Sequence, residues 1–286
     1  MTTLLDTAHG TTSVPTPTTP GRVTLARTTV AEWIKFRSVR STVWTLLATM
    51  ALMVGISVLA AWGTTQMDDA SVSSAGMNVA QLLSAGYQLA QLSVAVLGVL
   101  FITGEYSTGM VRSTFTATPR RLPVLWAKAF VLTAAVFAVT IVAMALSYLA
   151  TIAFHEELRA TFDLSNAETL RMTIGLPLYL AAIGLLAFSV GALVRNGAAA
   201  LTGVIALLLV VENVLVLFPV RAFEAISPFL PSAAGRRVLF DQEMITTLDA
   251  TTTGVHLTPW QGYAVLVAWV AALLVLAGVL LRRRDA

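Results

Sequence analysis

The chain has 286 residues, of which 57% are hydrophobic and only 12% are charged. One soluble core cannot bury so much apolar surface, so the composition excludes an ordinary soluble domain and indicates that lipid surrounds much of the chain. The net charge of +3 is small and the basic residues flank apolar segments, which argues against nucleic-acid binding. Because the chain has no cysteine, disulfides, thiolate catalysis and cysteine metal sites are excluded.

Apolar windows long enough to cross a bilayer occur six times. A hydrocarbon core of about 30 Å needs roughly 20 mainly apolar residues in a helix. Continuous apolar runs of this kind lack the alternation of a barrel strand. The sequence therefore predicts an all-α membrane protein with six transmembrane helices, at residues 42–62, 83–103, 130–154, 174–194, 198–218 and 262–281.

Two different segments precede the first predicted span. Residues 1–22 are rich in Thr and Pro and have no apolar signal-peptide core, so we expect a disordered cytoplasmic tail. Residues 23–41 place Val30, Trp33 and Ile34 on one helical face among basic residues, which predicts an interfacial helix. The alternative is an ordinary positive flank. The stretch EWIKFRSVRSTVWTL in this region resembles the entry into the first span of bacterial ABC-2 type transporter permeases, especially actinobacterial ones.

The loop after the second predicted span carries a sharper resemblance. Its sequence, EYSTGMVRSTFTATPRRLPVLWAK, follows the ABC-2 pattern in order and spacing, although Met110 stands where Thr is commoner. In that family the segment forms a coupling helix at the cytoplasmic surface that contacts the ATPase subunit. A solvated basic loop is the alternative. The residues that match, and that the resemblance assigns to ATPase contact, are Glu105, Tyr106, Gly109, Arg112, Phe115, Pro119, Arg121 and Lys128.

The chain carries no phosphate-binding loop for ATP. Such a loop needs Gly-Lys followed by Ser or Thr, but the only lysines, Lys35 and Lys128, follow Ile34 and Ala127. We therefore expect no enzyme activity and no bound cofactor in this chain. By the resemblance, ATP and Mg are used by a partner ABC ATPase, and a second permease, identical or related, completes the transport path.

Residues 152–259 contain the remaining features. The motif His155-Glu156-Glu157 lacks the second His of a zinc protease, because Arg159 stands in its place, so we expect no metal site. Only Arg195, Asn196 and Gly197 separate the fourth and fifth spans, which predicts a tight helical hairpin. Residues 219–259 mix apolar, charged and Pro residues, and this pattern fits a surface loop and re-entrant helices equally well.

Glu212 is the only charged residue in the six windows, and Asn213 follows it. An intramembrane carboxylate is costly and usually faces a bundle interior, where it can mark a transport path or a proton site. A local hydrogen bond with Asn213 is the simpler interpretation. Four glycines, Gly98, Gly184, Gly191 and Gly203, are expected to be helix contact points.

The distribution of basic residues gives the orientation. Thirteen of the 18 Lys and Arg residues fall in the N-terminal flank, the loop after span two, the 195–197 turn and the C-terminal end. Since basic flanks stay in the cytoplasm, both termini are expected inside, in a multi-pass protein of a bacterial plasma membrane. By the resemblance, residues 42–286 are expected to form the membrane domain of an ABC-2 exporter permease. The alternatives are an ion- or proton-coupled carrier that uses Glu212, and a membrane accessory protein that transports nothing.

Overall fold

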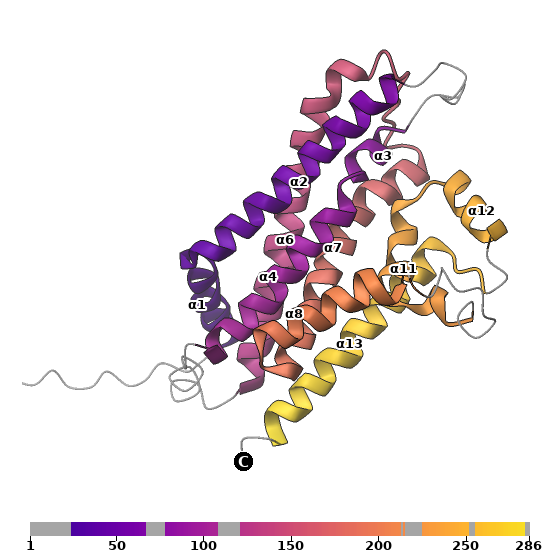
Figure 1. Cartoon of the computed structure of the whole chain (residues 1–286). Coiled ribbons are helices and arrows are strands. Elements are labelled where there is room, and N and C mark those ends of the chain that lie inside the picture. Colours follow the sequence, from indigo (N-terminus) through magenta and orange to yellow (C-terminus); the bar gives the residue numbers. More distant parts are fainter. Residues whose placement is uncertain are drawn as a thin grey trace, which may run out of the picture.

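The computed structural model describes residues 24–66, 78–107, 121–212, 214, 225–251 and 255–283. The regular structure of these residues is helical, without a sheet, and their single β-bridge joins Asn78 to Thr161. Five helical segments are long and apolar enough to cross a membrane (Figure 1). The chain is therefore a multi-pass helical membrane protein.

The elements follow one another as shown in Figure 1. They are α1 (Leu25–Ser38), α2 (Arg40–Thr65), α3 (Val79–Ser84), α4 (Tyr87–Ser107), α6 (Arg121–Thr151), η1 (Ile152–Phe154), α7 (Ala167–Val194), α8 (Gly197–Ile205), the π-helical η2 (Ala206–Val211), η3 (Ser227–Phe229), α11 (Pro231–Gly235), η4 (Arg236–Leu239), α12 (Gln242–Thr251) and α13 (Pro259–Arg283). The long segments α2, α3 with α4, α6, α7 and α13 confirm five of the six predicted spans.

The fifth predicted span, residues 198–218, is shorter than expected in the described part of the chain. Its apolar helix covers Gly197–Val211, which at 1.5 Å per residue is about 22 Å long. From Ala206 the helix widens into a π-helical stretch that leads to Glu212. Asn213 and residues 215–224 lie outside the described residues, so only part of this span is described.

The α7–α8 hairpin is confirmed. α7 ends at Val194 and α8 begins at Gly197. Arg195 takes a left-handed backbone conformation (φ 58°), and its N–H donates to the carbonyl of Gly191 over 2.9 Å. The Asn196 side chain then accepts a hydrogen bond from the N–H of Ala199, which caps the start of α8. These two caps reverse the chain within two residues.

The segments predicted to be cytoplasmic gather at one end of the bundle, which we call the α1 end. Here α2 and α6 begin, α4 and α13 end, and α7 turns into α8 (Figure 1). Gly197 lies against Thr103 near the end of α4, and Gly278 of α13 lies against Leu122 at the start of α6. The opposite end, called the α12 end, carries α3, η1 and α12.

Glycine allows α4 and α7 to pack closely. A Cβ atom at Gly98 would collide with the carbonyl oxygen of Gly184 and lie 3.0 Å from the backbone nitrogen of Phe188. One at Gly191 would lie 2.6 Å from Ile102 Cγ2. The predicted contact role is thus confirmed for these three glycines. For Gly203 no such contact is seen, because nothing among the described residues lies within 4 Å of a Cβ built there.

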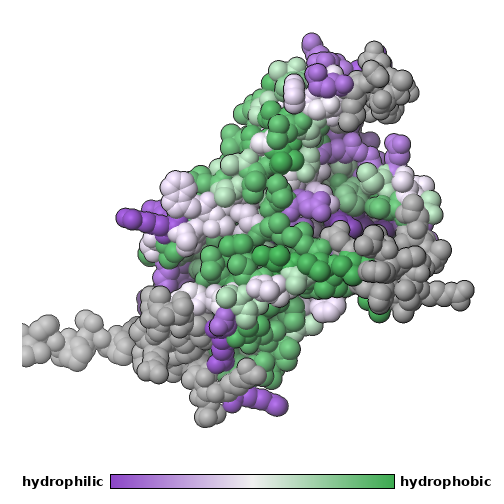
Figure 2. All heavy atoms as spheres, viewed as in Figure 1, coloured by the Kyte–Doolittle hydropathy of each residue, from purple (hydrophilic) through white to green (hydrophobic). Residues whose placement is uncertain are grey.

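Apolar side chains also cover the outside of the bundle. Figure 2 shows broad hydrophobic areas on the visible face, over α2, α8 and α13. On α2, Trp44 is 71% exposed and Leu59 and Trp62 are more than half exposed. Such large exposed apolar surface is rare on soluble monomers and suits contact with lipid.

The segment from η3 to η4 packs into the bundle beside α13. The carbonyl of Phe229 accepts a hydrogen bond from the Trp269 indole N–H over 2.9 Å, and Gly262 lies against the carbonyl of Ala234. Arg171 of α7 also donates to the carbonyls that end η4. Trp269 is ten residues into α13, about 15 Å from its start. Residues 231–239 are therefore mainly buried, which a wholly exposed loop would not be.

Single cysteines should report the orientation directly, because the chain has none of its own. Ser165 near the α12 end and Ser38 at the α1 end are both exposed, and cysteine has nearly the same size as serine. We expect an impermeant thiol reagent to label Ser165→Cys in intact bacteria, and Ser38→Cys only after permeabilisation. Labelling of Ser38→Cys in intact cells would contradict the predicted orientation, because it would place the α1 end outside.

Candidate functional site

Four charged side chains meet at the α1 end in what we call the charge cluster: Glu32, Lys35, Glu105 and Lys128. The Lys128 ammonium lies 2.6 Å from Glu32 Oε2 and 2.8 Å from Glu105 Oε1. Lys35 lies 3.1 Å from Glu32 Oε1 and 3.3 Å from Glu105 Oε1. The two lysines and two glutamates balance in charge, and they join α1, α4 and α6.

The cluster is largely shielded from solvent. Glu32 and Lys128 are each 2% exposed. The Lys128 ammonium also lies 4.6 Å from the centre of the Phe101 ring, a favourable cation–π contact. Phe101 in turn packs edge-on against Phe36 of α1. An ion pair in such surroundings is weakly screened, so loss of one partner would leave an uncompensated charge.

Lys35 is the most exposed member, with a side chain 34% exposed. Burial alone would lower its pKa, but attraction to Glu105 and the hydrogen bond and charge of Glu32 outweigh burial and raise the pKa above its ordinary value. The ammonium form is therefore the one present at physiological pH. Lys35 can act as a fixed positive charge at the edge of the cluster.

The helical repeat of α1 places Glu32 on its buried face. Thr28, Glu32 and Phe36 are buried and stand four residues apart, on one face of α1. The predicted apolar stripe is instead exposed, with Val30 at 59% and Ile34 at 62%. Phe36, which departs from that stripe in the sequence, is the residue that packs inward. This leaves Val30 and Ile34 on the outside, where lipid can contact them.

The structure brings together only the two ends of the predicted coupling segment. Glu105 in the last turn of α4 and Lys128 in α6 form the ion pair given above. Tyr106 belongs to α4 and Arg121 begins α6. The other four members of the set, Gly109, Arg112, Phe115 and Pro119, lie outside the described residues.

Sequence reasoning missed Glu32. It is the only acidic residue between Arg22 and Ser41, and it stands three residues before Lys35. A lone acid within a basic flank, at helical spacing from a lysine, was a usable signal. Its main partner, Lys128, is 96 residues away, and no local pattern points to that contact.

Glu212 is buried at 3% exposure, and its described partner is Ser232. Its carboxylate accepts hydrogen bonds from the backbone N–H of Ser232, over 2.9 Å, and from the Ser232 hydroxyl. Asn213, the predicted partner, lies outside the described residues. Glu212 thus connects the end of η2 to the start of α11, which is a structural role.

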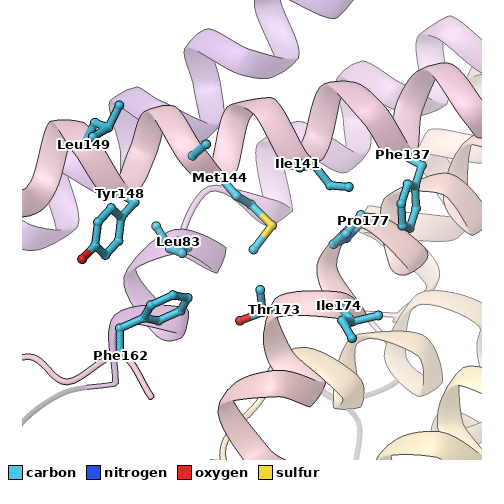
Figure 3. Close-up of a pocket in the computed structure, with 11 residues that line it drawn as sticks. Leu83, Phe137, Ile141, Met144, Tyr148, Leu149, Phe162, Thr173, Ile174 and Pro177 are labelled. Atoms are coloured by element: carbon cyan, nitrogen blue, oxygen red, sulfur yellow. The ribbon is translucent and has the colours of Figure 1, made fainter. Parts of the chain in front are cut away.

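An apolar pocket of about 520 Å³ opens between α6 and α7 toward the α12 end (Figure 3). Met144 and Ile141 of α6 face Ile174 and Pro177 of α7 across it, and Phe162 borders it from the loop between the two helices. Pro177 has no N–H for the carbonyl of Thr173 four residues earlier, so the α7 hydrogen-bond ladder is interrupted at the pocket wall. The pocket can hold a hydrocarbon group.

The described residues contain no group of three or more His, Asp and Glu side chains that could hold a metal ion. His155 lies 3.1 Å from the Thr151 hydroxyl and packs against Tyr148. Neither a scan against models of protein families nor a search of curated proteins finds a match for this chain.

Proposed function

We propose that this chain is the membrane-spanning permease subunit of an ATP-driven exporter of the ABC-2 type. The observation that carries the proposal is the charge cluster. Both ends of segment 105–128, whose sequence resembles the ATPase-coupling region, pair with each other and with Lys35 and Glu32 of α1. An ATPase that displaced this segment would pull on α1, α4 and α6 together.

Coupling of this kind needs a rigid joint between the helices that move together. A buried ion pair holds two elements in one arrangement because separating the charges leaves each of them unpaired in a poorly screened place. Glu32 and Lys128, both almost fully buried, supply such a joint between α1 and α6. The free energy of ATP hydrolysis, released in the partner subunit, would thereby reach the spans instead of being lost in a loose loop.

The rest of the proposal concerns topology and assembly. Six spans, with α8 and η2 as the first part of the fifth, would put both termini on one side of the membrane, and the basic flanks favour the bacterial cytoplasm as that side. The segment from η3 to η4 is a re-entrant element, supported by its burial along the first ten residues of α13. A second permease, identical or related, faces this one to enclose the path, and ATP and Mg are bound by the partner ATPases.

Co-purification tests the proposal. The tagged permease, expressed with the ATPase encoded beside it, is expected to retain that ATPase through affinity purification and size-exclusion chromatography. Arg112→Ala should lower the retained ATPase at least several-fold, because it removes a charge from the coupling segment. Arg282→Ala, which removes an exposed charge from the same end of the bundle, is the matched control and should retain the ATPase. A permease that never binds the ATPase refutes the proposal.

A carrier that works alone would need Glu212 to take up and release a proton or an ion. Its two hydrogen bonds from Ser232 favour a structural acceptor instead. The two functions separate in proteoliposomes: the exporter transports only with ATPase and ATP, whereas the carrier responds to an ion gradient alone and loses that response in Glu212→Gln. An accessory protein would show neither activity.

A further inference from the structure

We propose that a second pocket, at the α1 end, binds the phosphodiester head and one hydrocarbon chain of a membrane phospholipid. The pocket has a volume of about 440 Å³ and lies between α1, α2 and α4. It is separate from the apolar pocket of Figure 3. The proposal does not rest on an ATPase partner.

The start of α2 supplies an uncapped helix terminus at this pocket. α2 begins at Arg40, and the preceding residue, Val39, gives no side-chain capping bond. In the described part of the chain, the N–H groups of Arg40 and Ser41 have no backbone acceptor. Free N–H groups and the positive end of the helix dipole favour an anion, and phosphate is a common one. Val39 and Ser41 both line the pocket.

Thr42 gives an independent indication of a ligand. It lines the pocket, yet the residue is only 5% exposed. Its hydroxyl has no hydrogen-bond partner among the residues that the structure describes, whereas Thr45, one turn later, donates to the carbonyl of Ser41. The hydroxyl is a free donor in the lining of the pocket. A phosphate oxygen at the start of α2 would accept from it.

The charges around the pocket favour a singly charged head. Lys35 lines the pocket and its side chain is partly exposed, and the exposed residues Arg37 and Arg40 are next to pocket residues in the chain. Glu105 lines it too, and although Lys35 and Lys128 neutralise this carboxylate, it opposes a second negative charge on the ligand. A phosphodiester, with one charge, fits this balance better than a phosphate monoester.

The remaining wall is apolar and belongs to α4. Leu97, Leu100 and Phe101 line it, and Leu100 is 41% exposed toward the outside of the bundle. A hydrocarbon chain can therefore enter from the side while the head lies at the start of α2. The combination of an anion site with an apolar wall is what distinguishes a phospholipid from a free phosphate ion.

The test is a titration of the purified full chain, in detergent, with a soluble short-chain phosphatidylglycerol. We expect saturable binding, and binding about tenfold weaker in Thr42→Val, since one hydrogen bond to a charged group is lost. Thr42→Val keeps the shape of the side chain and breaks no bond within the described protein. Thr133→Val on α6, away from the pocket, is the matched control and should bind like the wild type.

Two further probes identify what is bound. The matching diacylglycerol, which lacks the phosphate, should bind at least tenfold more weakly than the phospholipid. Inorganic phosphate should displace the phospholipid only weakly. If diacylglycerol bound as tightly as the phospholipid, the pocket would be an apolar crevice without an anion site. If inorganic phosphate bound tightly, the ligand would be a free ion and not a lipid. Either result, or unchanged affinity in Thr42→Val, overturns the proposal.

Discussion

Lys128→Met is expected to destabilise the protein by about 3–5 kcal/mol, the typical cost of removing one partner from a buried ion pair. The substitution keeps the length of the side chain but leaves Glu32, which is 2% exposed, with Lys35 alone, and Glu105 without its 2.8 Å contact. Thermal unfolding in detergent, followed by size-exclusion chromatography, measures the loss. At the upper end of this range, Lys128→Met should also lower the yield of folded protein strongly.

Two variants make this result specific to the charge cluster. Lys35→Met removes the same charge from a side chain that is one third exposed, so its cost should be much smaller. The double variant Lys128→Met with Glu32→Gln removes one charge of each sign, and it should recover a large part of the stability. If Lys128→Met were as stable as Lys35→Met, the cluster would not be the joint that we describe.

Gly98→Ala is expected to cost about 3 kcal/mol, at the upper end of the usual range for overpacking. The added Cβ atom would meet two backbone atoms of α7, the carbonyl oxygen of Gly184 and the nitrogen of Phe188, the latter at 3.0 Å. Backbone cannot rotate away as a side chain can, so α4 and α7 must separate. The same thermal measurement in detergent reports the loss.

Gly203→Ala is the matched control for this substitution. It makes the same change inside an apolar helix, but nothing described lies within 4 Å of the new atom. Because alanine favours helix over glycine by about 1 kcal/mol, this variant should be as stable as the wild type or slightly more stable. Equal stability of Gly98→Ala and Gly203→Ala would show that α4 and α7 are not in close contact at Gly98.

The sequence was sufficient to predict the spans because hydropathy is a local property. Windows 42–62, 174–194 and 262–281 each lie within one long helix, and window 130–154 lies within α6 and the short η1 that continues it. The same reasoning missed the break at residues 85–86, where α3 ends and α4 begins. The apolar run continues across this break, and Gly86 is its local sign in the sequence.

Contacts between distant residues were harder to foresee. Gly98 and Gly184 could be named as contact points because glycine in an apolar helix is informative by itself, but Gly203 has the same signature and packs against nothing described. Glu212 was recognised as an interior acid, yet its partner Ser232 lies 20 residues on in a segment whose course was undecided. The fold brings these pairs together, and local pattern does not encode which pairs they will be.

The Gly262–Ala234 and Trp269–Phe229 contacts constrain the order in which the chain can mature. Residues 231–239 lie against α13, which is synthesised after them, as well as against α7. A chain still attached to the ribosome before residue 259 therefore has no α13 surface on which to settle this segment. The α12 end can close only once the final span has left the translocon, so chains truncated before that point should be recognised as unfinished and degraded.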